Sequence, residues 1–133
     1  MSLFKELEKN IEGDVSADPK KIKLVSQDES IFSCTPEIVV APKHIQDMQA
    51  VVQIAQAYDA SVVPRGGGSG TTGAALGDQI VLDCRTYMHK IIAVENDTAW
   101  VEPGVYLVLN SISKLHLKTW FLDLTLGVKI MLV

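Results

Sequence analysis

A cluster of glycines constrains the fold of this chain more than any other feature of its sequence. Six of the nine glycines fall between Gly66 and Gly77, in a segment that lies between two short apolar runs, Ser61–Pro64 and Gln79–Asp83. Glycine has no Cβ and adopts backbone conformations closed to other residues, so this pattern predicts a tight turn of bare backbone between two strands. A flexible surface linker is the alternative, and the Pro64-Arg65 lead-in with a strand on each side disfavours it.

Two familiar nucleotide-binding motifs do not fit this loop. Gly68–Gly73 satisfies G-x-G-x-x-G, but that fingerprint must open a long helix. Only Ala74-Ala75-Leu76 separate the motif from the turn at Gly77-Asp78. A Walker loop fails because no Lys-Ser or Lys-Thr pair follows the glycines. What remains is a loop whose successive N–H groups can converge on an anion such as a pyrophosphate. Hydroxyl donors would be added by Ser69, Thr71 and Thr72.

The sequence before the loop predicts helices alternating with strands. Apolar residues recur at helical spacing over His44–Tyr58, which predicts a helix between the strands Glu37–Ala41 and Ser61–Pro64. A strand–helix–strand order is the crossover unit of a parallel sheet. A shorter helix capped by Ser2 is expected over Leu3–Ile11. The polar residues from Asp14 to Pro36 are expected to form a loop, with one extended piece near Ile22–Val25.

The sequence after the loop predicts a hairpin, a helix and an apolar tail. Lys90–Glu95 and Thr98–Glu102 flank Asn96-Asp97, which is a good two-residue turn. A helix is expected from Val105 to about His116. In the tail, Thr119–Val133, apolar residues occupy the even positions from 122 to 132, which predicts a half-buried strand or two. We expect this tail either to join the domain's own antiparallel strands or to pair with a second copy in a homodimer.

Composition narrows the class of protein and of site. With 133 residues, 47% of them hydrophobic, the chain fits one folded domain, and its net charge of −4 disfavours nucleic acid as a partner. No window reaches the roughly 18 uninterrupted apolar residues of a membrane span. The N-terminus has no signal-peptide pattern, so a cytoplasmic location is expected. Cys34 and Cys84 are expected to be buried or partly buried thiols rather than parts of a disulfide framework. Neither a metal site nor a catalytic nucleophile–base pair is expected, because the histidines share no ligand spacing.

Three motifs in order resemble a known family. They are Val62–Gly73 followed by Ile80–Asp83, then Asp83–Ile92, then Ala99–Val105. Together they resemble the FAD-linked oxidases, the vanillyl-alcohol-oxidase-like flavoproteins with a PCMH-type FAD-binding domain. The spacing is similar to that of the branch with D-lactate, glycolate and D-2-hydroxyglutarate dehydrogenases. The resemblance covers about Ile31–Lys118.

This resemblance implies an FAD site built largely from backbone. The glycine loop would hold the FAD pyrophosphate through its amides, and Pro103-Gly104-Val105 would lie near the adenine-side phosphate and ribose. Arg65 in such a turn braces the loop more often than it touches phosphate. In covalent members a histidine at the place of Ser69 bonds the flavin, so FAD here is expected to be non-covalent. The expected cofactor-binding residues are Arg65, Gly66, Gly67, Gly68, Ser69, Gly70, Thr71, Gly73, Pro103, Gly104 and Val105.

The fold class that the resemblance implies is α+β. The first subdomain would be a small parallel sheet with helices, followed by the first antiparallel strands of the second subdomain. Residues 1–133 are interpreted as one incomplete FAD-binding domain, with a helix and loop over about 1–35, a family-like region over 36–118 and a divergent apolar tail over 119–133. The second phosphate loop and the substrate-binding cap of the family have no counterpart here.

Two functions of different class follow. The first is the FAD-binding subdomain of a flavin-dependent oxidoreductase for a D-2-hydroxy acid of lactate, glycolate or 2-hydroxyglutarate type. Because the flavin carries the hydride chemistry and the parts that position the substrate are missing, FAD binding is expected to be weak or absent and the chain inactive alone. The second is a non-catalytic remnant, an α/β module that binds no FAD and associates with itself through its tail. Visible flavin absorbance of the purified protein would separate the two.

Overall fold

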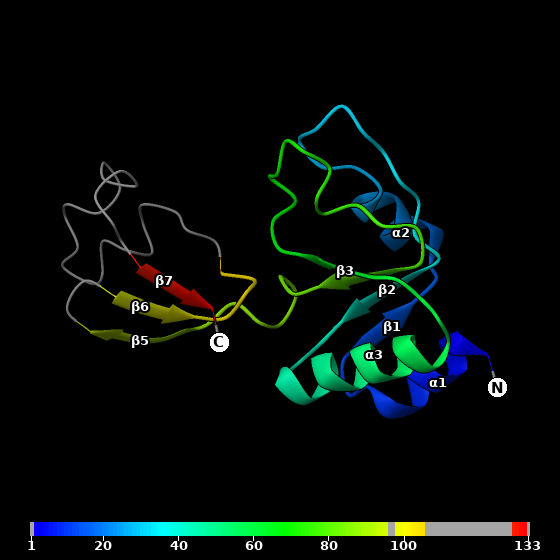
Figure 1. The fold of residues 1–133 in the computed structure, drawn as a ribbon, viewed down its shortest axis with the longest axis horizontal. Helices are drawn as coiled ribbons and strands as arrows, with labels where there is room; N and C mark the ends of the chain where they lie inside the picture. The colour runs from blue at the N-terminus through cyan, green and yellow to red at the C-terminus, as the bar shows by residue number, and fades with distance from the viewer. Residues whose placement is uncertain (1, 96–97, 106–128, 133) are drawn as a thin grey trace.

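The computed structural model describes residues 2–95, 98–105 and 129–132, and these residues form two sheets (Figure 1). The first has four strands in the order β1-β2-β4-β3, and the second has three in the order β5-β6-β7. The strands of the first sheet are β1 (Asp14–Ser16), β2 (Ile38–Ala41), β3 (Val62–Arg65) and β4 (Ile80–Asp83). Its helices are α1 (Leu3–Asn10), α2 (Pro19–Val25) and α3 (Ile45–Ala57).

The four-stranded sheet confirms the predicted parallel crossover. Strands β2 and β3 both run parallel to β4, which lies between them, and α3 connects β2 to β3. Strand β1 pairs antiparallel with β2 at one edge. The three helical and strand segments predicted from residue 37 to residue 65 therefore appear where they were expected, within a residue or two at each end.

Side chains of the central strands alternate between two apolar layers, as the two-residue period of a strand requires. On one face Val40 and Ile80 pack in a core with Leu7 of α1 and Val51 of α3, all with no exposed surface. On the other face the buried side chains of Val39 and Val81 pack against Val25, with the partly buried Ile22 beside them. The helices thus cover both faces of the sheet and leave the ends of its strands for the loops.

Helix α2 corrects the prediction of a loop with an extended piece near Ile22–Val25. Asp18 caps the helix by accepting a hydrogen bond from Lys20 N at 2.8 Å, and Pro19 stands at its first turn. Ile22 and Val25 are three residues apart, so a helix places both on the face that meets the sheet. The cap predicted for Ser2 is also wrong, because its side chain makes no capping hydrogen bond to α1.

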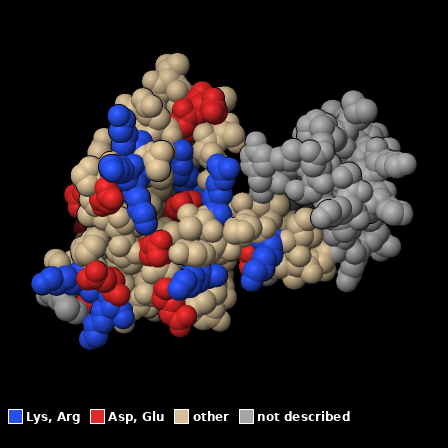
Figure 2. Space-filling view, turned by 180° about the vertical axis from the view of Figure 1, so that it is seen from behind, with Lys and Arg blue, Asp and Glu red and all other residues tan. Residues whose placement is uncertain are grey.

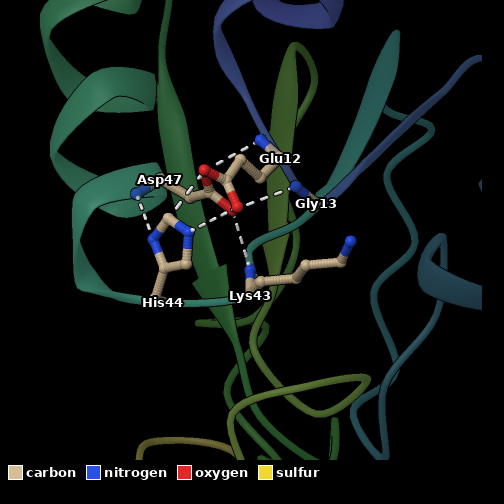
Figure 3. Close-up of polar contacts among 5 residues, drawn as sticks. All are labelled: Glu12, Gly13, Lys43, His44 and Asp47. Carbon is tan, nitrogen blue, oxygen red and sulfur yellow. Dashed lines mark hydrogen bonds and ion pairs between the residues drawn. The ribbon is translucent and has the colours of Figure 1, made fainter.

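A buried carboxylate joins α1, β1 and α3 (Figure 3). Asp47 is 2% exposed, and its two oxygens accept from Glu12 N at 3.0 Å, Gly13 N at 3.0 Å and Lys43 N at 2.9 Å. His44 caps the same helix by accepting from Asp47 N at 3.3 Å, and its Nε2 lies 3.3 Å from a carboxylate oxygen of Glu12. A negative charge in the first turn of α3 is also favourable to the helix dipole.

The second sheet contains the predicted hairpin. Strands β5 (Ile91–Glu95) and β6 (Thr98–Val101) pair antiparallel, while the turn residues Asn96-Asp97 lie outside the described residues. Strand β7 (Lys129–Leu132) pairs with β6 in parallel, so this part of the tail joins a sheet of its own chain. Apart from Val105, which is described and not helical, the helix predicted over Val105–His116 lies outside the described residues, as does the tail before residue 129. A homodimer through the tail stays a prediction.

The charged surface is mixed in sign. From behind, acidic and basic side chains are interspersed over the described part of the chain (Figure 2), and Lys21 pairs with Asp14 at 3.4 Å. Within that same part, no helix is long and apolar enough to cross a membrane.

Candidate functional site

The glycine loop leaves the sheet at the carboxyl end of β3, where Arg65 is the last residue paired with β4. Ligands of parallel α/β sheets bind beyond this end of the strands, because the connecting loops gather there. The loop lies beside the segment 26–34 (Figure 1). A backbone hydrogen bond from Glu29 N to Gly68 O, 3.2 Å long, joins the two.

The middle of the loop presents open backbone. A Cβ added at Gly67 or Gly70 would meet no atom within 4 Å, and both residues are exposed, as is Ser69 between them in space and sequence. Among the hydrogen bonds of the described residues, none uses the N–H of Gly67, Gly68, Ser69 or Gly70. Gly68 is buried, whereas the exposed Gly67, Ser69 and Gly70 can offer their N–H groups to an incoming anion, as a backbone cradle for phosphate requires.

Arg65 holds the loop in place through hydrogen bonds of its guanidinium to backbone carbonyl groups. Its guanidinium is nearly buried and donates to the carbonyl oxygens of Gln27 at 2.7 Å, Val25 at 3.3 Å and Ala75 at 3.4 Å. A Cβ at Gly68 would overlap this guanidinium, and the φ of Gly68 is +70°. Glycine is thus required at this position both for space and for backbone conformation. The bracing role expected of Arg65 matches this geometry, while its contact with phosphate stays a prediction.

The predicted binding segment Pro103-Gly104-Val105 lies against the start of the loop. The carbonyl oxygen of Pro103 is 3.5 Å from the position of a Cβ on Gly66. Gly104 donates to Met88 O at 2.7 Å, and a Cβ at Gly104 would overlap the carbonyl of Cys84. The fold therefore brings together Gly66 and Pro103-Gly104, which are far apart in sequence. Val105 extends from this contact, with its N–H donated to Glu102 O at 3.1 Å.

The segment 27–33 lies beside the glycine loop, a position that the sequence did not predict. Hydrogen bonds from Ser30 lower the pKa of Asp28 below its usual 3.8, and the positive charge of Arg65 adds to this effect, while burial opposes it. One oxygen of Asp28 accepts from Ser30 N at 2.9 Å, and the other is buried without a hydrogen-bond partner among the described residues. Phe32 lies against Gly73, 3.2 Å from the position of a Cβ there. The Asp-x-Ser pattern was the readable signal, because it favours a local turn.

Cysteine and metal chemistry do not contribute to this site. Cys84 is buried, and burial, with the charge of Asp83, raises the pKa of its thiol to about 11. Cys34 is half-buried, so both thiols are sheltered as predicted. Across residues 2–95, 98–105 and 129–132, no group of three His, Cys, Asp or Glu side chains is placed to hold a metal ion.

Comparison with known proteins identifies the family. The family model described as "FAD binding domain" matches residues 36–127. The chain belongs to this FAD-binding family. FAD is the cofactor of the family, and the open amides from Gly67 to Gly70 fit its pyrophosphate, because a diphosphate needs several converging donors and close backbone approach.

Relatives place this FAD-binding domain near dehydrogenases of 2-hydroxy acids. A D-2-hydroxyglutarate dehydrogenase of Escherichia coli (strain K12) is 32% identical over 111 residues, which are 79% of this chain and 11% of that protein. A mitochondrial D-lactate dehydrogenase [cytochrome] of Kluyveromyces lactis is 32% identical over 85 residues, 54% of this chain and 15% of that protein. The chain therefore spans only a small part of the relatives that it matches. The predicted resemblance to FAD-linked oxidases with these dehydrogenases is confirmed.

A solved structure confirms the fold class. The chain superimposes on the crystal structure of p-cresol methylhydroxylase with substrate bound at a TM-score of 0.67, with 20% identity over 86% of this chain and 24% of that chain. At this identity the likeness establishes the fold alone. The chain has the mixed α/β architecture of PCMH-type FAD-binding domains, with a small sheet whose core is parallel.

Proposed function

We propose that this chain binds FAD without a covalent bond, through the backbone of its glycine loop, as the FAD-binding subdomain of an oxidoreductase for a D-2-hydroxy acid. The observation that carries the proposal is the run of N–H groups from Gly67 to Gly70, which no hydrogen bond among the described residues uses, together with the open space at Gly67 and Gly70. The relatives support the substrate class, since those reported act on D-2-hydroxyglutarate or D-lactate by their names.

Different residues of this chain would have different roles in binding FAD. The amides of Gly67 and Gly70 would donate to the pyrophosphate, with the exposed hydroxyls of Ser69 and Thr71 beside them. Arg65 would hold the loop in the shape that aims these donors, through its bonds to carbonyl groups. Serine at position 69 has no imidazole, so it cannot form the histidyl bond of covalent relatives. When bound, FAD supplies a hydride acceptor.

The expected affinity is modest. Hydrogen bonds to a charged acceptor contribute about 1.5–3 kcal/mol each, and association first costs at least about 4 kcal/mol. The chain matches 11% of its Escherichia coli relative, and the hydrogen bonds counted here come from the glycine loop alone. We therefore propose a dissociation constant for FAD no tighter than tens of micromolar, or roughly 6–7 kcal/mol, and no turnover by this chain alone.

Calorimetric titration of the full chain with FAD and with ADP tests the proposal. Both ligands carry the pyrophosphate, so both should bind saturably, and Gly67→Val should weaken both because its side chain fills the open space above the loop. Gln53→Val, on an exposed position of α3, is the matched control and should bind as the unaltered chain does. Absence of saturable binding of either ligand at millimolar concentration would refute the proposal and favour the α/β module that binds no FAD.

A further inference from the structure

Two apolar side chains stand uncovered at the rim of the glycine loop. Ile31 is 95% exposed and Phe32 is 56% exposed, although the ring of Phe32 lies against Gly73. Neighbouring exposed apolar side chains beside an open binding loop indicate a surface that a ligand covers. Hydrogen bonds join their segment to the glycine loop at several points, so the two side chains lie in a defined position.

Those ties hold Phe32 in a fixed place relative to the open amides. Glu29 N donates to Gly68 O at 3.2 Å, and Arg65 donates to Gln27 O at 2.7 Å from beneath the same loop. Phe32 N in turn donates a hydrogen bond to the Ser30 hydroxyl oxygen at 3.1 Å. The aromatic ring and the anion cradle therefore belong to one braced unit.

The two ends of the loop differ in what lies beside them. Gly66, at the start, adjoins the carbonyl of Pro103, whereas Gly73, near the end, adjoins the ring of Phe32. A dinucleotide whose pyrophosphate lies over the middle of the loop extends its two ring systems in opposite directions. If the cofactor follows the loop from Gly66 to Gly73, one ring system leaves the loop toward Phe32.

We propose that Phe32, with Ile31 beside it, is an apolar platform for the dimethylbenzene part of the flavin ring. Neither side chain carries a hydrogen-bonding group. Adenine has donors and acceptors around most of its edge, which would lose hydration if that edge packed against Ile31 and Phe32, whereas the methyl-bearing edge of the dimethylbenzene ring has none to lose. Stacking of an aromatic ring on a flat ligand is favourable. This inference rests on the proposed function, because it assumes that the loop holds the pyrophosphate.

The test compares the two halves of the cofactor. Phe32→Ala should raise the dissociation constant of FAD about tenfold, equivalent to about 1.4 kcal/mol, and leave that of ADP unchanged within twofold. Val52→Ala is the matched control, since Val52 is 55% exposed on α3, away from the loop, and it should change neither constant. Phe32→Trp gives a second readout, because an indole in contact with a flavin quenches its fluorescence by electron transfer. Bound FAD should therefore be dimmer in this variant than in the unaltered chain.

The outcomes separate this inference from the function on which it rests. If FAD and ADP both bind the unaltered chain, but Phe32→Ala weakens neither or weakens both equally, the platform is refuted and the loop site stands. Unchanged fluorescence of FAD bound to the Phe32→Trp variant would refute it too. If the unaltered chain binds neither FAD nor ADP, the proposed function fails and the platform fails with it.

Discussion

Substitution by alanine should strongly destabilise the chain at Gly68 and leave its stability almost unchanged at the adjacent Gly67. In Gly68→Ala, a φ of +70° is unfavourable for an L residue by about 1–2 kcal/mol. The new Cβ would also displace the Arg65 guanidinium, and the loss of even one of its hydrogen bonds to carbonyl groups costs about 1.5–3 kcal/mol. We therefore expect a loss of about 3–4 kcal/mol in the free energy of unfolding. In Gly67→Ala the Cβ enters open space, so the change should stay within about 0.5 kcal/mol.

Thermal and urea denaturation followed by circular dichroism measures both effects. For a chain of 133 residues, 3–4 kcal/mol corresponds to a fall in Tm of about 10–15 °C. Gly67→Ala serves as the matched control, because it makes the same chemical change one residue away. If Gly68→Ala were as stable as Gly67→Ala, Arg65 would not stand beneath Gly68, and the account of how the loop is braced would be wrong.

Three further outcomes are expected. Asp47→Ala leaves the N–H groups of Glu12, Gly13 and Lys43 without their acceptor. It should therefore lower the free energy of unfolding, measured by urea denaturation, by about 3 kcal/mol. An unchanged free energy of unfolding would show that water replaces the carboxylate. The raised pKa of Cys84 means that the folded thiol stays neutral up to about pH 11, while the unfolded thiol ionises near pH 9.0. The free energy of unfolding should therefore decrease as the pH rises from about 9 to about 11. In Cys84→Ala this decrease should be smaller. The chain with added FAD and a dye acceptor should not oxidise D-lactate or D-2-hydroxyglutarate, and measurable turnover would refute the view that substrate positioning lies outside it.

The sequence was informative where the structure depends on local pattern. Helix α3 was predictable because thirteen residues give a clear apolar period, and the glycine loop because its composition leaves few alternatives. Helix α2 was missed because seven residues are too short for a clear period, although Asp18-Pro19 is a readable helix start. The open amides of the loop follow from its glycines alone.

The bracing of the site was not predictable, because it depends on residues brought together by the fold. Arg65 reaches carbonyl groups in the segment before β2, and Phe32 reaches Gly73 from the same segment. That segment reads as polar loop, with no periodic pattern to indicate where it packs. The packing of α2 on the sheet places this segment beside the glycine loop, and that packing could not be predicted from the sequence.

Amide chemical shifts during a titration with ADP test the central claim most directly. In two-dimensional ¹⁵N–¹H spectra of the full chain, the backbone N–H signals of Gly67, Gly68, Ser69 and Gly70 should show the largest shifts, because no hydrogen bond among the described residues uses these donors and the proposal places the pyrophosphate against them. Inorganic pyrophosphate should move the same signals in the same direction. If these signals stay in place while others, such as those of the lysines of α2, move on addition of ADP, the glycine loop is not the site that holds the cofactor.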